Sequence, residues 1–565
     1  MSPLDWAVLI AALAFFVGYG VWKSQGDRNL ADFLIAGRTM SWPMVMLSVM
    51  ATQASAITFL STPGQGYADG MRFVQFYFGL PLAMIVLCVT AIPIFHRLRV
   101  FTAYQYLEDR FDAKTRSLAA GLFLLQRGLA VGLTIYAPSL ILSVILDWDV
   151  RYTCMLLGAL AVAYTAWGGS RAVSHTHALQ FTIIMATMAV AAALLWNKMP
   201  GGLTPGEALG AAGAFGRMNA LELNFDPNDR YNLWSGLIGG FFLQLAYFGT
   251  DQSQVGRYLT GSSVAQSRLG LLMNGLVKIP MQLVILGVGV LVFVFYAFIT
   301  PPLFFNPASR AAVTAGPHAV EWRVLEERHE AVAAERRESL IELIEAQRVK
   351  DASREAAARA ALREDQAEID RTRGEAVELI AKTRPDAPRN DTNYIFLTFV
   401  LAHLPTGLIG PVFAAIFAAS MNSTAAELNA LTSTTVVDVV QRVRPAATKE
   451  GGTLGLSRLV TVGWAIFAVL FAQYVSRLGS LIEAVNILGS LFYGTILGIF
   501  LTAFYAKRVG GTAVFAGALV AQVVVVLCFA FTKISFLWYN LIACLLVVGI
   551  GLALSLARPR AASPA

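Results

Sequence analysis

Long apolar stretches recur along almost the whole chain, separated by short polar loops. About twenty apolar residues suffice for a helix to cross the hydrocarbon core of a membrane. The pattern therefore predicts an all-α polytopic membrane protein with about thirteen transmembrane helices. The predicted spans are 5–23, 41–62, 72–95, 116–144, 150–167, 173–196, 232–250, 268–298, 405–438, 455–475, 481–505, 511–532 and 535–556.

The composition agrees with this pattern. Of 565 residues, 56% are hydrophobic and only 14% are charged, whereas soluble domains are about a quarter charged. The net charge of +7 comes from basic residues in alternate loops, such as Arg97, Arg110 and Lys114 after the third span and Lys507 and Arg508 near the end. Because basic loops stay inside, we expect an outside N-terminus and an inside C-terminus, in a bacterial inner (plasma) membrane. Charge that sets topology argues against nucleic-acid binding.

The apolar pattern is interrupted by a charged segment, which divides the chain into three parts. We expect transmembrane parts at 1–300 and 396–565 and an extramembrane helical insert at 301–395. Residues 318–384 are rich in Ala and in charges of both signs, which predicts one long helix or a two-helix hairpin turning near Asp351. The insert is either a tolerated loop extension, which we favour because charge-rich helices are usually solvated, or an arm for a protein partner or for self-association.

Two stretches carry unusual polarity inside spans, where polar residues are costly and therefore candidates for function. Residues 47–67, LSVMATQASAITFLSTPGQGY, contain hydroxyl and amide groups and the pair Pro63-Gly64. They suggest irregular backbone, which is tolerated at membrane depth only where it lines a cavity, and whose carbonyls could bind a cation. Residues 418–435 place Ser, Thr and Asn oxygens on adjacent turns. These suit a hard cation such as sodium, although small hydroxyl residues also serve close helix packing.

Other polar side chains stand singly in the spans. Gln244 and Tyr247 lie one turn apart, and isolated charges occur at Arg127, Lys278 and Glu427. Arg127 could bind an anionic substrate, because a guanidinium pairs well with a carboxylate. It could equally form a structural ion pair, for example with Glu427. Glu427 could also carry a proton, and the sequence leaves these alternatives open.

Motifs of catalytic chemistry are missing from the sequence. It has no P-loop, GxSxG, HExxH or paired CxxC motif, and its four cysteines lie within spans without metal-ligand spacing. We therefore do not expect an enzyme.

Taken together, these stretches resemble the sodium/solute symporter family, which includes glucose, proline, iodide, multivitamin, monocarboxylate and sialic acid symporters. The resemblance covers roughly residues 5–530 without the insert and is nearest the iodide, multivitamin and monocarboxylate branch. It implies a LeuT-like core of two inverted five-helix repeats and sodium-coupled import of a small polar solute by alternating access. The motifs that carry it are LSVMATQASAITFLSTP (47–63), YQYLEDRF (104–111), IYAPSL (135–140), GGSRAVSHTHALQ (168–180), GTDQSQVGRYL (249–259), AASMNSTAAELNALTSTTVVD (418–438) and SLFYGTILGIF (490–500).

The resemblance also implies a sodium site. Carried over without gaps, the site falls on the backbone carbonyls of Ala51, Ala54 and Ala419 and on the side chains of Asn422 and Ser423. Asn422 stands where the family usually has a hydroxyl, and an amide oxygen can also ligate sodium.

A second sodium site, present in some members, would need an aspartate and two more hydroxyls. This chain has His177, Ala425 and Ala426 at those positions. The resemblance therefore implies one sodium ion.

The family's substrate cavity has a counterpart in this sequence. Ile57 and Thr58 stand where sugar-transporting members place a carboxylate and an amide, so a small organic anion is expected in place of a sugar. Two alternatives remain, a proton-coupled transporter and a transporter-like sensor or scaffold that uses the outer insert. The expected substrate-binding residues are Gln53, Thr58, Phe76, Gln244 and Tyr247, together with Arg127.

Overall fold

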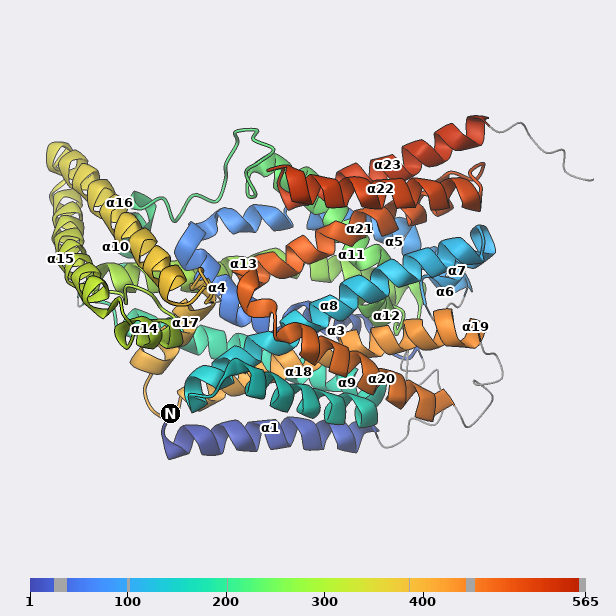
Figure 1. The fold of residues 1–565 in the computed structure, drawn as a ribbon, viewed down its shortest axis with the longest axis horizontal. Coiled ribbons are helices and arrows are strands. Elements are labelled where there is room, and N and C mark those ends of the chain that lie inside the picture. Colours follow the sequence, from blue (N-terminus) through green and yellow to red (C-terminus); the bar gives the residue numbers. More distant parts are fainter. Residues whose placement is uncertain (25–37, 99–101, 201, 386, 444–452, 558–565) are drawn as a thin grey trace, which may run out of the picture.

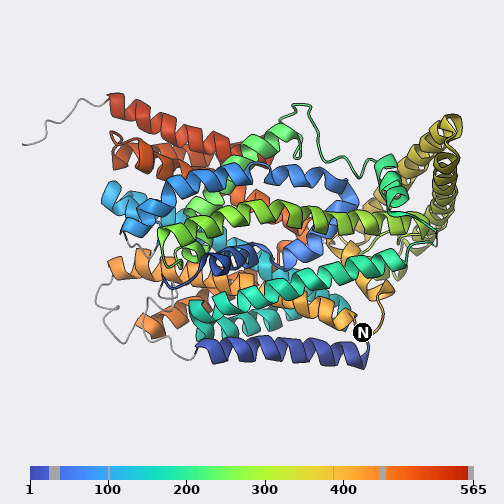
Figure 2. The same cartoon turned by 180° about the vertical axis from the view of Figure 1, so that it is seen from behind.

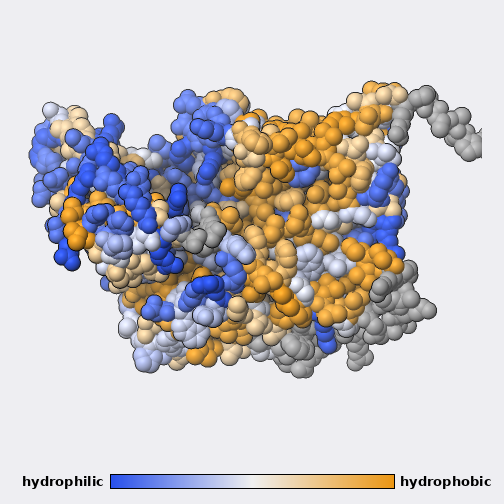
Figure 3. Space-filling view, in the orientation of Figure 1, coloured by the Kyte–Doolittle hydropathy of each residue, from blue (hydrophilic) through white to orange (hydrophobic). Residues whose placement is uncertain are grey.

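The computed structural model describes residues 1–24, 38–98, 102–200, 202–385, 387–443 and 453–557. Within these ranges every regular element is helical. Most helices lie side by side with their axes roughly aligned and form a bundle (Figures 1 and 2). A large part of the bundle surface is hydrophobic (Figure 3), as expected for a face that contacts lipid.

The predicted spans are helical, and eight helical segments of the described residues are long and apolar enough to cross a membrane. The prediction of an all-α polytopic membrane protein is confirmed. The segments expected at 150–167 and 173–196 both lie in α9, whose apolar parts are Val150–Ala163 and Phe181–Asn197. The elements of the first half are α1 (Pro3–Ser24), α3 (Trp42–Gln53), α4 (Ala56–Asp69), η2 (Gly70–Tyr77), α5 (Leu80–Val89), α6 (Ala91–Leu98), α7 (Gln105–Arg110), α8 (Ala113–Leu146), α9 (Val150–Asn197), α10 (Pro205–Ala214), η3 (Ser235–Gly239), α11 (Gly240–Thr250), α12 (Gln252–Tyr258) and α13 (Val264–Phe298). Those of the second half are α14 (Pro307–Thr314), α15 (Ala319–Val349), α16 (Ala352–Thr383), α17 (Thr392–His403), α18 (Ile409–Thr434), η4 (Thr435–Val440), α19 (Gln441–Val443), α20 (Thr453–Ala472), η6 (Val475–Leu478), α21 (Leu481–Tyr505), α22 (Gly511–Phe531) and α23 (Phe536–Ala557).

The irregular backbone expected within residues 47–67 lies at Ala54 and Ser55, between α3 and α4. Ala54 has φ −83° and ψ 67°, and Ser55 is extended with φ −79° and ψ 175°. Pro63 and Gly64 do not break the chain, because α4 continues through them to Asp69. The break is therefore made by small residues at the end of α3.

Gly64 has a packing role instead. A Cβ added to Gly64 would overlap the carbonyl oxygen of Thr392 at the start of α17. Close approach of two helix backbones needs such a small residue. The glycine thus lets α17 lie directly against α4, which holds the second half of the broken pair in place.

The insert forms a hairpin of α15 and α16 at one end of the bundle, the end that also carries the N-terminus (Figure 1). Lys350 takes a left-handed conformation with φ 58°, and the Asp351 side chain caps α16 by accepting from the backbone N–H of Ser353 at 3.0 Å. Leu340 and Leu343 are fully buried between the helices, while the outer face is hydrophilic (Figure 3). Of the two sequence alternatives, the structure shows the hairpin.

Buried polar contacts attach the hairpin to the end of α13 and to the segments that flank the hairpin in the chain. His329 bonds to the carbonyl of Pro301 at 3.0 Å, and Arg336 donates to the carbonyl of Tyr296 at 2.8 Å. Arg373 makes two bonds to Asp391, at 2.9 and 3.0 Å. Burial lowers the pKa of His329 to about 4. The insert is therefore docked on the core through desolvated contacts.

Candidate functional site

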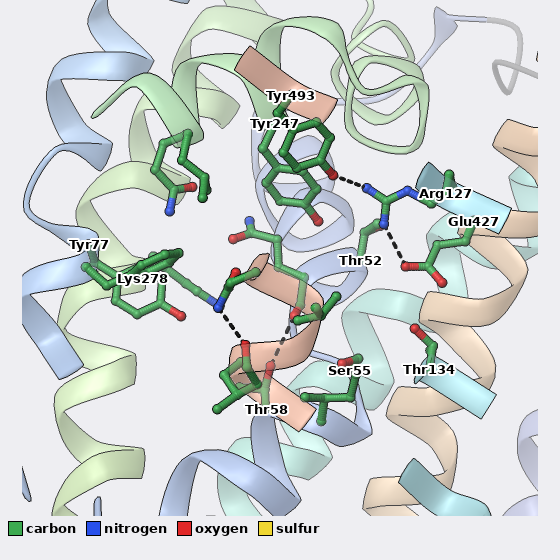
Figure 4. A pocket seen from close by; sticks show the side chains of 18 residues that line it. Thr52, Ser55, Thr58, Tyr77, Arg127, Thr134, Tyr247, Lys278, Glu427 and Tyr493 are labelled. Carbon is green, nitrogen blue, oxygen red and sulfur yellow. Dashed lines mark hydrogen bonds and ion pairs between the residues drawn. The ribbon is translucent and has the colours of Figure 1, made fainter. Parts of the chain in front are cut away.

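A cavity of about 100 Å³ lies beside the break between α3 and α4 (Figure 4). It is enclosed by side chains from α3, α4, η2, α8, α11, α13, α18 and α21, which are far apart in the sequence. All six residues expected to bind substrate line it. The lining residues are Thr52, Gln53, Ser55, Ile57, Thr58, Phe76, Tyr77, Arg127, Thr134, Leu243, Gln244, Tyr247, Lys278, Glu427, Ile482, Val485, Asn486 and Tyr493.

Two of the elements expected to hold sodium, the end of α3 and α18, are in contact at the same break. Ser423 of α18 donates its hydroxyl to the carbonyl of Thr52 in the last turn of α3, at 3.3 Å. Ala51 and Thr52 belong to that last turn, whose carbonyls lack the partners that a continuing helix would provide. Ala54 and Ala419 are also buried.

Asn422 carries an observation that bears on the fit of a cation. The residue is only 1% exposed, and its Oδ1 accepts no hydrogen bond within the described residues. A buried acceptor without a donor is costly, and a cation would satisfy it. The set of neutral oxygens at Ala51, Ala54, Asn422 and Ser423 suits a hard monovalent cation.

Two of the three positions that the family resemblance assigns to a second sodium site carry alanine in the described part of the chain. Ala425 and Ala426 are buried and offer methyl groups where hydroxyls would be needed. The side chain of His177 lies outside the described residues.

Arg127 is held by two carboxylates. Its Nη1 donates to Oε1 of Glu427 at 2.9 Å, and its Nη2 donates to the hydroxyl of Tyr493 at 2.6 Å (Figure 4). Its Nη2 also contacts Oδ2 of Asp251. Tyr493 in turn donates to Asp251 at 2.7 Å. The internal ion pair with Glu427, one of the two alternatives left open by the sequence, is present. The guanidinium is 3% exposed and already matched by two negative charges.

Three polar residues form a stripe along α13, on the side of the cavity opposite Arg127. Asn274, Lys278 and Gln282 follow one another at intervals of four, so they share a helix face. Asn274 accepts from Nε2 of Gln53 at 2.8 Å, and Gln282 donates to the hydroxyl of Tyr77 at 2.7 Å. The first and last members thus tie α13 to α3 and η2, and Lys278 lies between them.

Sequence reasoning missed several of these residues. Asp251 appears in the sequence only as part of the motif 249–259, without a predicted role, and Lys278 only as an isolated charge without a predicted partner. The structure adds Asp251, Tyr77 and Tyr493 to the site. Tyr493 lies within the stretch 490–500, which carries part of the family resemblance, and this was the available signal. The partners of Tyr77 come from distant helices, so no local pattern could have found them.

Comparison with known proteins gives a family. The model of the sodium:solute symporter family matches residues 33–320 and 383–549, which leaves residues 321–382 of the insert hairpin unmatched. A Na⁺-coupled sialic acid symporter solved in a substrate-bound, outward-open state superposes with a TM-score of 0.75 at 20% identity, covering 99% of this chain and 98% of the other. That similarity shows a shared fold.

Curated relatives match a shorter part of the chain. The human sodium/iodide cotransporter is 30% identical over 305 residues, 53% of this chain and 46% of the relative. The human sodium-coupled monocarboxylate transporter 1 is 32% identical over 273 residues, 48% of this chain and 44% of the relative. The alignments thus span less than half the length of these relatives. Because the family model matches most of the chain, this protein belongs to the sodium:solute symporter family, a family of transporters and not of enzymes.

Proposed function

We propose that this chain is a sodium-coupled symporter that imports a small organic anion by alternating access. The observation that carries the proposal is the shared position of the two candidate sites. Thr52 lines the cavity with its side chain and receives the Ser423 hydroxyl on its carbonyl. A cation at the break and a solute in the cavity would therefore act on the same few residues, which is what coupling requires.

One sodium ion would be held by the carbonyls of Ala51, Ala54 and Ala419 and by the side chains of Asn422 and Ser423. These groups come from α3, α18 and the break, so the ion would pull together elements that are separate in the chain. Ligand groups on a broken helix can be assembled or dispersed by small shifts of that helix. Binding would thus stabilise one arrangement of α3 and α4 against α18.

The solute would lie against residues of different chemistry. Phe76 and Tyr247 offer aromatic surface, and Gln244 offers an amide. Gln53 is tied to Asn274 and Thr58 to the carbonyl of Gln53 at 3.1 Å, so these two shape the wall. The names of the relatives refer to iodide and monocarboxylates, which are anions. That supports an anionic substrate here.

The surroundings of the core are also part of the proposal. The chain is a multi-pass integral membrane protein, and we propose that its N-terminus and the insert 301–395 lie outside. The family match skips residues 321–382, which supports treating the insert as an addition to a core formed by 1–300 and 396–565. Its exposed face remains a candidate for a protein partner or a second copy.

Uptake into proteoliposomes tests the proposal. We expect an inward sodium gradient to drive accumulation of short monocarboxylates such as propionate, and a proton gradient alone to drive none. Asn422→Ala and Ser423→Ala should each raise the sodium concentration for half-maximal uptake by about tenfold or more, because each removes an oxygen from a buried cation.

Ser433→Ala is the matched control, because Ser433 is buried in the same helix and donates to Ala430 within it. Its sodium dependence should equal that of the unchanged protein. Accumulation driven by protons without sodium would instead support the proton-coupled alternative. Unchanged sodium dependence in the Asn422 and Ser423 variants would refute the site.

A further inference from the structure

Lys278 is a buried cation whose charge is not matched by the protein around it. It lies near the middle of α13, is 2% exposed and lines the cavity. Within the described residues no carboxylate lies within 4 Å of its Nζ, and the group in contact with it is the ring of Tyr77, whose centroid is 5.7 Å away. Burial of a cation without a counter-charge at membrane depth is costly and marks a functional residue.

The neighbours of Lys278 on α13 have partners of their own. Asn274, one turn before, is engaged by Gln53, and Gln282, one turn after, is engaged by Tyr77. Both are fully buried. They fix the position and rotation of α13 against α3 and η2. The stripe therefore presents the ammonium of Lys278 to the cavity from a rigid wall.

The charges of the site fall into two separate groups. Arg127, Asp251 and Glu427 form one cluster with one positive and two negative charges. Lys278 stands apart from this cluster, on the side of Tyr77 (Figure 4). Asp251 also accepts from the backbone N–H and the hydroxyl of Ser253, at 2.8 and 2.6 Å, so it is fixed at the start of α12. The cluster cannot neutralise Lys278 without losing these contacts.

We propose that Lys278 binds the carboxylate of the transported solute, and that the substrates are small monocarboxylates. The proposal rests on the proposed transport function and specifies its substrate class. A single negative charge on the solute would bring the charge near Lys278 to zero, whereas a neutral solute would leave the ammonium unpaired. The remainder of the solute would meet Phe76 and Tyr247, which favours a short apolar or aromatic body.

This assignment differs from an anchoring role for Arg127. Both Nη atoms of Arg127 are already engaged by carboxylates and by Tyr493. A substrate carboxylate at Arg127 would have to displace one of them or add a third negative charge. Lys278 needs no such displacement.

Direct binding of matched acids and amides tests the assignment. The probes are propionate, L-lactate and nicotinate, each paired with its neutral amide, titrated calorimetrically into purified protein at fixed NaCl. We expect the unchanged protein to bind at least one acid and to bind its amide far more weakly. Lys278→Met should weaken binding of that acid by roughly 30-fold or more, because a charge-assisted contact is lost. Its affinity for the amide should not fall.

Three further variants control for a general loss of structure. Lys278→Gln is a second neutral replacement and should show the same selective loss, and Lys278→Arg should retain most of the affinity for the acid. Gln282→Met changes the same helix face one turn away without changing charge, so any effect should fall equally on acid and amide. Equal losses for acid and amide in Lys278→Met, no loss at all, or binding of none of the acids by the unchanged protein would each overturn the assignment.

Binding and sodium-driven uptake separate this inference from the function beneath it. Acid binding that depends on Lys278, without sodium-driven uptake, would overturn the proposed symport and support the assignment. Sodium-driven uptake of an acid whose half-saturating concentration is the same in Lys278→Met as in the unchanged protein would support the proposed symport and overturn the assignment of Lys278.

Discussion

Replacing Arg127 by Met would remove the cation that lies between Asp251 and Glu427 in the membrane core. Met preserves much of the apolar stem of Arg and removes its guanidinium. Asp251 would keep three donors, the Tyr493 hydroxyl at 2.7 Å and the N–H and hydroxyl of Ser253 at 2.8 and 2.6 Å. Glu427 would lose its donor at 2.9 Å. The damage should therefore fall mainly on Glu427.

The size of the effect follows from these contacts. Breaking a buried ion pair by removing one partner costs about 3–5 kcal/mol, because a desolvated charge is left behind. The second oxygen of Glu427 is buried and accepts no hydrogen bond within the described residues. We expect Arg127→Met to lower the free energy of unfolding by about 3–5 kcal/mol. Adding Glu427→Gln should restore about 2 kcal/mol, because the orphaned charge disappears.

Unfolding by sodium dodecyl sulfate in mixed micelles, followed by tryptophan fluorescence, measures this cycle. Arg151→Met is the matched control, since Arg151 pairs with Asp149 at 2.9 Å on the exposed surface, and its midpoint should not move. The double variant should also keep its preference for acids over amides, because Lys278 is unchanged.

Three results would refute the reasoning about Arg127. One is a loss of less than about 1 kcal/mol in Arg127→Met, which would show that the pair is not desolvated. The second is a double variant no more stable than Arg127→Met, which would show that Glu427 is not the stranded group. The third is a double variant that is stable and yet has lost its preference for acids, which would return the anchoring role to Arg127.

Two further predictions concern the insert and the packing of α4. Burial lowers the pKa of His329 from 6.5 to about 4, so its contribution to stability is complete above pH 6.5 and falls by about 3 kcal/mol as the pH drops to 4. The protection factors of the α15 amides, which are the exchange rates corrected for the intrinsic rate at each pH, should fall over this range, and His329→Gln should abolish that fall. Gly64→Ala should lower the melting temperature in detergent, because the added methyl overlaps the carbonyl of Thr392 and overpacking costs about 1–3 kcal/mol. Gly287→Ala, with open space around its Cβ position, should not, and equal melting temperatures for the two variants would contradict this packing role.

Much of the fold was predictable from the sequence because membrane insertion imposes a simple rule. Helices must satisfy their own backbone and must be apolar for about twenty residues, so runs such as 481–505 appear directly in the sequence. The hairpin turn near Asp351 was also predictable from local sequence, because a helix-capping residue and a change in the residue pattern mark it. The family resemblance also assigned Gln53, Thr58 and Tyr247 to one cavity, and in the structure all three line it.

Other features depended on contacts between distant segments. The local signals for irregular backbone, proline and glycine, pointed to Pro63-Gly64, whereas the family resemblance pointed to the carbonyls of Ala51 and Ala54, and the break lies at Ala54. In the structure Gly64 serves contact with Thr392, more than 300 positions away, and the helix continues. A residue that looks like a breaker can thus be a packing residue, and only its neighbours show which.

The sequence by itself determined that this is a helical membrane protein of the symporter family, with a charged insert and polar residues at the ends and middle of particular spans. It determined that Arg127, Lys278 and Glu427 are charges at membrane depth. The tertiary structure decided which of these charges has an opposite charge beside it, because ion pairing depends on distances between side chains of different helices. Arg127 meets Glu427 across 300 positions of chain, whereas Lys278 meets the ring of Tyr77 and the cavity. Charges that look alike in the sequence therefore differ in the structure: Arg127 and Glu427 neutralise each other within one cluster, whereas Lys278 faces the cavity without a carboxylate partner among the described residues.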